Sequence, residues 1–176
     1  MKIFAVFDEK GFPKAFFSPD IHKEIPAEAI EIEEAVWKQL ITDPKLAFVN
    51  GELIDTTNKV WEITGWRDKT EEELRTEKIK TFSEELKNQE FQRLQKVLSD
   101  YGYKDLGGVQ YWHSQDPDDP EPKGLLDWYE AYDDAIWEEI DNLQNKTFEE
   151  LKDYDPIEVE NQIFERTKNK LPPLED

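Results

Sequence analysis

The stretch TEEELRTEKIKTFSEELKNQEFQRLQKVLSDY, residues 70–101, decides the fold of the second half of the chain. Its apolar residues recur near the ~3.6-residue period of an α-helix rather than the ~3.5 of a coiled coil. These residues are Ile79, Phe82, Leu86, Phe91, Leu94, Leu98 and Tyr101. Thr70 and Glu73 have the spacing of a capping box, in which both side chains accept hydrogen bonds from backbone N–H groups at the helix start. The pattern predicts one long, acidic, amphipathic helix that projects from a small head.

The residues before this helix have β-strand patterns. Two aromatic, β-branched runs lie on either side of Gly11 and Pro13, which predicts a hairpin over residues 2–17. Asn50 and Gly51 stand between two further apolar runs. They indicate a type I′ turn, because both central residues of that turn need a positive φ.

Further elements are expected between and after these segments. Residues 33–41 have apolar side chains at helical spacing, and the alternation around Trp61 predicts another strand. Residues 114–124 contain several prolines and are interpreted as a loop, and a helix should follow it. The apolar face of that helix comprises Leu125, Tyr129, Tyr132, Ile136, Ile140 and Leu143. Asp155 before Pro156 marks one more helix start.

These patterns predict an α+β fold. Residues 1–66 form a small antiparallel β-rich head with a short helix, residues 67–101 form the long acidic helix, and residues 102–176 form a helical C-terminal module. A chain of 176 residues is long enough for one domain with a substantial core, or for a small domain with a helical extension.

Composition excludes several classes of function. The chain has 42 acidic and 22 basic residues and a formal charge of −20, which repels nucleic-acid phosphates and anionic lipid headgroups. We therefore expect neither nucleic-acid nor membrane binding. The chain has no cysteine, so disulfides, thiolate metal sites and a cysteine nucleophile are excluded. Without an apparent signal or spanning segment, the protein is expected in the cytoplasm unless a larger particle carries it out.

The histidines do not indicate a metal or catalytic site. His22 lies between acidic residues but has no second imidazole or thiolate nearby in sequence, whereas a metal site needs three or four converging ligands. We interpret Pro19, His22 and Pro26 as parts of a structural turn. His113 precedes Ser114, but neighbours along the chain do not make a catalytic triad.

The acidic loop 116–121 offers the oxygen ligands that calcium prefers, but prolines interrupt the pattern of a calcium-binding loop. A solvated linker is the favoured interpretation, and ion binding there stays open. No metal, cofactor or catalytic residue is predicted.

Most aromatic side chains are expected in the core, and a minority are expected to form a patch for a partner protein. The candidates are Trp66, Tyr111 and Trp112 near the joins between segments, with Phe16 and Phe17 on a strand of the head. The residues thus favour a non-enzymatic interaction protein.

Two stretches resemble bacteriophage tail proteins. Residues 11–41, GFPKAFFSPDIHKEIPAEAIEIEEAVWKQLI, resemble the amino-terminal segment of tail fibre assembly proteins, and residues 101–140 are similar to a module of phage tail proteins. The first likeness rests on Ser18, Pro19, Ile21, His22, Ile25, Pro26, Ala29, Ile30, Glu31, Ile32, Trp37 and Leu40. The second rests on Gly102, Tyr103, Leu106, Tyr111, Ser114, Asp116, Pro117, Trp128, Ala135, Ile136 and Trp137.

The resemblance implies a non-catalytic protein that helps a tail fibre fold or trimerise, or that stays attached as a tail component. Its partner would be a tail fibre or another tail protein, with homo- or hetero-oligomers both open. It would act in the host cytoplasm during assembly and, if retained, in the virion tail. In the resemblance, His22 belongs to a turn. The long helix and the helices after residue 145 depart from the typical small assembly factor.

A second hypothesis treats the chain as an acidic DNA mimic that inhibits a host restriction or CRISPR nuclease, because regularly spaced carboxylates can imitate phosphates. Lysines interleaved with the acids, as at Lys78 and Lys80, dilute such a track. A small enzyme with a paired-carboxylate site is a third hypothesis, since acidic pairs are plentiful but none is distinguished from the rest.

Overall fold

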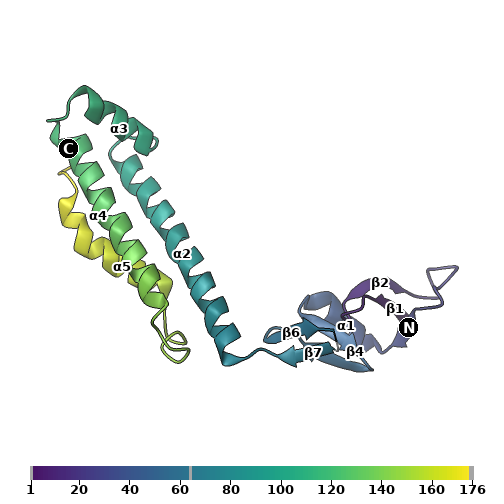
Figure 1. Ribbon diagram of the computed structural model, residues 1–176. Coiled ribbons are helices and arrows are strands. Elements are labelled where there is room, and N and C mark those ends of the chain that lie inside the picture. Colours follow the sequence, from purple (N-terminus) through teal and green to yellow (C-terminus); the bar gives the residue numbers. More distant parts are fainter. Residues whose placement is uncertain (1, 64, 175–176) are drawn as a thin grey trace. The chain divides into compact units, whose positions relative to one another are not determined.

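The computed structural model describes residues 2–63 and 65–174 and divides the chain into two compact units. Unit 1 is Met1–Thr70 and contains the strands, and unit 2 is Glu71–Asp176 and contains the long helices (Figure 1). The predicted α+β class is confirmed. Within the described ranges, no helix is long and apolar enough to cross a membrane.

Unit 1 begins with a three-stranded antiparallel sheet in the order β2-β1-β3. Its strands are β1 (Ile3–Phe7), β2 (Pro13–Phe17) and β3 (Ile30–Ile32), and helix α1 (Glu34–Thr42) follows them. The predicted hairpin over residues 2–17 and the predicted short helix are both present. A small core joins the sheet to the helix through the buried side chains of Ile3, Ala5, Ile32 and Leu40.

Two further hairpins complete unit 1. They are formed by β4 (Leu46–Val49) with β5 (Glu52–Asp55) and by β6 (Lys59–Glu62) with β7 (Gly65–Asp68). The turn between β4 and β5 has φ values of 53° at Asn50 and 91° at Gly51. Both residues therefore have the positive φ that the predicted turn requires.

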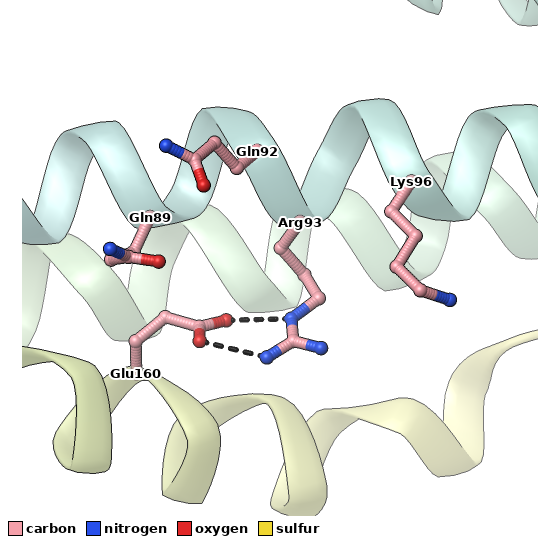
Figure 2. A pocket seen from close by; sticks show the side chains of 5 residues that line it. All are labelled: Gln89, Gln92, Arg93, Lys96 and Glu160. Atoms are coloured by element: carbon pink, nitrogen blue, oxygen red, sulfur yellow. Dashed lines mark hydrogen bonds and ion pairs between the residues drawn. The ribbon is translucent and has the colours of Figure 1, made fainter.

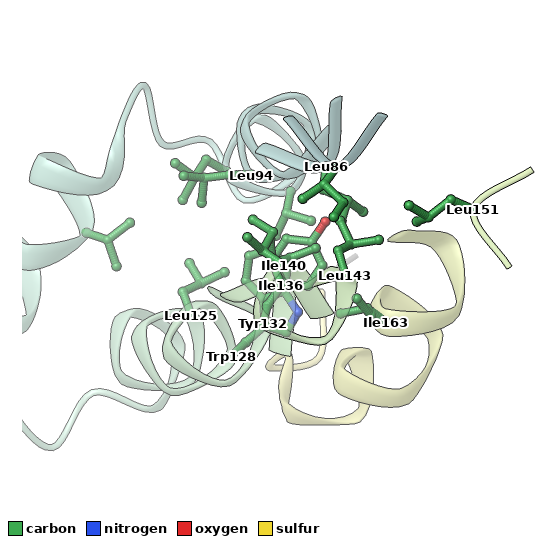
Figure 3. Packing of buried hydrophobic residues seen from close by; sticks show 14 residues of the cluster. Leu86, Leu94, Leu125, Trp128, Tyr132, Ile136, Ile140, Leu143, Leu151 and Ile163 are labelled. Carbon is green, nitrogen blue, oxygen red and sulfur yellow. The ribbon is translucent and has the colours of Figure 1, made fainter. Parts of the chain in front are cut away.

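Unit 2 is built from four α-helices among the described residues. They are α2 (Glu71–Asp100), α3 (Leu106–Gln115), α4 (Pro120–Leu143) and α5 (Pro156–Thr167), and a short 3₁₀ turn η1 (Lys168–Lys170) follows α5. Helix α2 packs against α4 and α5, and α3 packs against α4. Figure 3 shows side chains from these helices meeting in one core, in which Leu86, Trp128, Tyr132 and Ile136 are completely buried.

The sequence predicts the long helix as a segment of its own, residues 67–101, whereas the structure unites it with the C-terminal helices. Leu86, Leu94 and Leu98 of α2 are buried in the same core as α4 and α5. The structure therefore places the division of the chain between residues 70 and 71 and unites α2 with the C-terminal helices. The physical reason is that the apolar stripe of α2 needs a partner surface, and the helices that supply it come later in the chain.

The proline-containing segment also differs from the expected loop over residues 114–124. Helix α4 begins at Pro120, and the Asp119 side chain caps it by accepting a hydrogen bond of 3.0 Å from the backbone N–H of Glu121. Proline suits the first helical position, because the N–H that it lacks would have no partner there. A short connection, residues 116–119, is what separates α3 from α4.

We predict that Gly11→Ala destabilises unit 1 far more than Gly51→Ala does. Both glycines have a positive φ, 89° and 91°, but a Cβ at Gly11 would lie 2.7 Å from the carbonyl oxygen of Phe48, whereas a Cβ at Gly51 meets nothing within 4 Å. The expected costs are about 2–4 kcal/mol for Gly11→Ala and about 1 kcal/mol for Gly51→Ala.

Hydrogen exchange of the β1, β2 and β4 amides in the full chain, read by mass spectrometry, measures this difference. Equal loss of protection in the two variants would contradict the prediction, because it would mean that the close approach to β4 contributes nothing.

Candidate functional site

Phe16 and Phe17, which the sequence predicts as partner-binding residues of the head, make contacts within unit 1. Phe16 packs against the core of the three-stranded sheet, and the Phe17 ring lies 5.3 Å from the His22 ring. Both belong to β2, which is an edge strand of that sheet. What β2 offers a partner is therefore its backbone edge more than its rings.

Trp66 is also tied down by its own unit. Its indole Nε1–H donates a hydrogen bond of 2.8 Å to the carbonyl oxygen of Lys10. Its ring packs edge-on against Phe12 at 5.7 Å and Trp61 at 5.4 Å between ring centroids. The residue thus fastens the β6–β7 hairpin to the β1–β2 turn, which makes it a weaker candidate for partner binding than its sequence position suggests.

The predicted turn around His22 is a local hydrogen-bonded structure. The backbone N–H of His22 donates to the carbonyl oxygen of Ser18 at 2.8 Å, and the imidazole Nδ1 accepts from the Ser18 N–H at 3.1 Å. Pro19 lies within this turn, and Pro26 follows it four residues after His22. In the part of the chain that the structure describes, no group of three or more His, Asp or Glu residues is arranged to hold a metal ion.

Tyr111 and Trp112 are the predicted candidates whose rings remain accessible. Their side chains are 59% and 58% exposed, and their ring centroids lie 5.6 Å apart in an edge-to-face arrangement on α3. The helix beneath them is firmly held, because Val109 is fully buried and the Asp105 side chain caps the first turn through the Gly108 N–H. This rigid, exposed aromatic pair is the candidate binding site.

Two more exposed rings in unit 2 were not predicted as candidates. Phe91 of α2 is 61% exposed, although its spacing placed it on the expected apolar face, and Trp137 of α4 is 47% exposed. The ammonium group of Lys87 lies 4.2 Å from the centroid of the Trp137 ring. The period of a helix does not say where its buried stripe ends, so sequence alone cannot separate Phe91 from its buried neighbours.

A buried ion pair joins the helices of unit 2. Arg93 of α2 donates two hydrogen bonds of 2.9 Å to the carboxylate of Glu160 on α5, and the hydroxyl of Tyr132 on α4 donates a third. The Glu160 side chain is only 2% exposed. Figure 2 shows the two charged groups facing each other beside a cavity of about 240 Å³, whose other lining residues are Gln89, Gln92 and Lys96.

The charges at this cavity are already paired. Burial, followed by the hydrogen bond that Tyr132 donates to Glu160, raises the pKa of Tyr132, and the hydrogen bonds that Arg93 donates to Glu160 raise the pKa of Arg93. Lys96 bonds to Asp100 at 3.1 Å. These groups hold helices together. They could not be recognised from local sequence patterns, because Arg93 and Glu160 are 67 residues apart.

A second acidic group sits between α2 and α4. Burial, and then the adjacent carboxyl of Asp133, raises the pKa of Glu90 to about 7. The hydroxyl of Tyr129 also reaches Glu90, at 3.5 Å. At neutral pH, Glu90 is therefore partly protonated, and a positive charge placed near it would favour its ionised form.

No protein-family model, curated protein or solved structure matches this chain.

We predict that the free energy of unfolding of unit 2 falls as the pH rises from 4.5 to 7, in part through Glu90. The pKa of Glu90 is about 7 in the folded chain and 4.5 ordinarily, so between these values the folded state holds a proton that the unfolded state has released. The resulting contribution to stability is complete below pH 4.5 and is lost as the pH rises through 7. Glu90→Gln should remove this component and exceed the parent chain in stability by about 1 kcal/mol at pH 8, after allowance for solvent screening.

Urea unfolding followed by far-UV circular dichroism at pH 5 and pH 8 gives the comparison. The exposed Glu84 of the same helix supplies a matched control, Glu84→Gln, which should keep the pH profile of the parent. A Glu90→Gln variant with the parent's pH profile would contradict the prediction.

We predict that Arg93→Met destabilises unit 2 by about 3–5 kcal/mol, because it leaves the Glu160 carboxylate buried without a counter-charge. The double variant Arg93→Met with Glu160→Met should regain a large part of this loss, since it removes both charges together. Urea unfolding at neutral pH measures both. A double variant no more stable than the single variant would contradict this prediction, because the loss would then not come from leaving the Glu160 charge without its counter-charge.

Proposed function

We propose that this chain is a non-catalytic accessory protein of a bacteriophage tail fibre, which binds the fibre or another tail protein during assembly. The observation that carries the proposal is the exposed Tyr111–Trp112 pair on α3. Tryptophan and tyrosine dominate the binding energy of protein interfaces, where rigid rings bury a large area at a small entropic cost. Two such rings on a firmly held helix favour a protein partner over a small substrate.

The sequence resemblance supports the kind of partner. The first resembling stretch, residues 11–41, contains β2, β3 and most of α1, and the second, residues 101–140, contains α3 and most of α4. Each stretch therefore corresponds to consecutive structural elements rather than to scattered positions. The second stretch includes the exposed aromatic pair.

The head suits a partner rich in strands. Both β2 and β3 are edge strands of the first sheet, and an edge strand can pair with another chain through its backbone groups. Trimeric fibres depend on long-range β pairing, which forms slowly and leaves strand edges open in the meantime. A small protein that covers those edges would lower the risk of aggregation during assembly.

We predict that Tyr111→Ala with Trp112→Ala lowers recovery of a tail protein from a phage-induced lysate by at least about tenfold, because two exposed anchors of about 1 kcal/mol or more each are lost. The measurement is a pull-down with the tagged full chain, read by quantitative mass spectrometry, together with far-UV circular dichroism of the variant. The matched control is Ile157→Ala on α5, whose side chain is 47% exposed.

The control should keep full recovery, and the double variant should keep its circular dichroism. Recovery of a tail protein from lysate but absence of this chain from purified particles would identify an assembly factor, and presence in both would identify a tail component. Recovery of a host nuclease in place of any tail protein would overturn the proposal in favour of the DNA-mimic hypothesis.

A further inference from the structure

The exposed side of α4 carries acidic side chains without basic ones among them. Between Gly124 and Leu143 the helix contains no lysine or arginine. Its solvent-facing residues at spacings of three and four are Asp127, Glu130, Asp134, Glu138 and Asp141. Within the described residues, none of these five carboxylates is in an ion pair, as the ion pairs present involve other acids. We call this row the acidic face of α4.

By contrast, the acids of α2 are often neutralised by the same helix. Glu84 lies 3.9 Å from Lys80 and Asp100 lies 3.1 Å from Lys96, each one turn away. Such ion pairs leave little net charge on these parts of α2 to attract a partner. The five carboxylates of α4 have no such basic neighbour on their own helix between Gly124 and Leu143.

Exposed aromatic rings adjoin the acidic face. Trp137 projects from the same side of α4 as Asp134 and Asp141, and it is 47% exposed. Helix α2 packs beside α4 (Figure 1), and its Phe91, which is 61% exposed, lies one turn beyond the Lys87 that covers Trp137. Trp137 thus lies beside the carboxylates, and Phe91 lies one turn along α2 from Lys87, the cation that contacts Trp137.

The contact between Lys87 and Trp137 shows how a cation can lie against this ring. The ammonium group stands 4.2 Å from the ring centroid, which is the geometry of a cation–π interaction. In this contact, the Trp137 ring binds the Lys87 ammonium group close to carboxylates that form no ion pair among the described residues. A lysine or arginine from another chain would find the same combination, and arginine in particular can stack on a ring while it hydrogen-bonds a carboxylate.

We propose that the acidic face of α4, together with Trp137 and Phe91, docks a lysine- and arginine-rich segment of a partner protein that also carries apolar side chains. The inference rests on the proposed function only in taking the partner to be a protein. Charge complementarity selects a basic segment, and the two rings require apolar side chains among its basic ones.

Glu90 links this docking to pH. It lies at the α2–α4 contact, where Asp133, Tyr129 and Tyr132 of α4 and Lys87 of α2 surround it. A bound cation favours the ionised form of Glu90, so docking should release a proton near neutral pH. Affinity should then be higher at pH 8 than at pH 6, and Glu90→Gln should reduce this difference.

The experiment uses isothermal titration calorimetry of the full chain with a synthetic helical peptide that has Lys and Arg on one face and Leu on the other. A second peptide with Glu in place of every Lys and Arg tests charge. The first peptide should bind and should weaken as salt is raised, because exposed charges are screened. The second peptide should show no binding.

Variants locate the surface. Asp134→Lys with Glu138→Lys should weaken binding of the basic peptide roughly tenfold or more. Asp118→Lys with Asp153→Lys makes the same change in net charge in exposed loops outside α4 and should leave affinity within about twofold. Trp137→Ala should weaken binding, and Trp137→Phe should restore most of it, because a ring is retained. Far-UV circular dichroism confirms that each variant is folded.

Equal binding of the two peptides, or equal weakening by the two pairs of substitutions, would overturn the inference. Its failure can be told apart from failure of the proposed function. If the basic peptide binds as described while no tail protein is recovered from lysate, the docking surface stands and the tail-fibre proposal falls. If a tail protein is recovered from lysate while the two peptides bind equally, the tail-fibre proposal stands and the inference falls.

Discussion

The arrangement of unit 2 depends on one buried carboxylate. Glu160 of α5 is 2% exposed, and an ionised group at that depth is tolerated only when its counter-charge and hydrogen bonds are fixed in place. Those partners come from the other two long helices, Arg93 from α2 and Tyr132 from α4. The Phe164 ring, 4.3 Å from the guanidinium carbon of Arg93, covers the remaining face of that cation. A shift of any helix by one residue would break the set, so the pair fixes register where apolar packing alone would allow sliding.

That register decides which side of α4 is left for a partner. Tyr132 stacks on Trp128 with ring centroids 5.2 Å apart, and both rings pack edge-on against Phe164, so the aromatic side of α4 is turned inward. The opposite side then carries the carboxylates and Trp137 into solvent. The buried network and the acidic face are therefore two consequences of the same rotation of one helix. A change that disturbs the first should be expected to disturb the second.

Local patterns in the sequence were sufficient for much of the fold. The helical period between residues 70 and 101, the Asn50–Gly51 turn and the Asp155–Pro156 helix start depend on neighbouring residues, and each is present in the structure. Features that depend on distant residues were not predictable. The role of Trp66 depends on a carbonyl 56 residues away, and the burial of Glu160 depends on Arg93. Tyr111 and Trp112 are exposed, and so is Phe91, although it was expected on the apolar face of its helix. Only the packing of α4 and α5 defines where that face ends.

The acidic face also bears on the choice between a protein partner and DNA mimicry. A mimic needs carboxylates free of interleaved lysines, and α4 meets that condition where α2 does not. Yet a nuclease groove is shaped to receive a polar, charged backbone. A large indole that projects among the carboxylates would enter this groove without apolar groups to pack against, and it would keep polar groups of the groove from their hydrogen-bond partners. The same indole is an asset against a protein segment that brings both cations and apolar side chains. The position of Trp137 within the acidic row thus favours recognition of a basic, partly apolar protein surface.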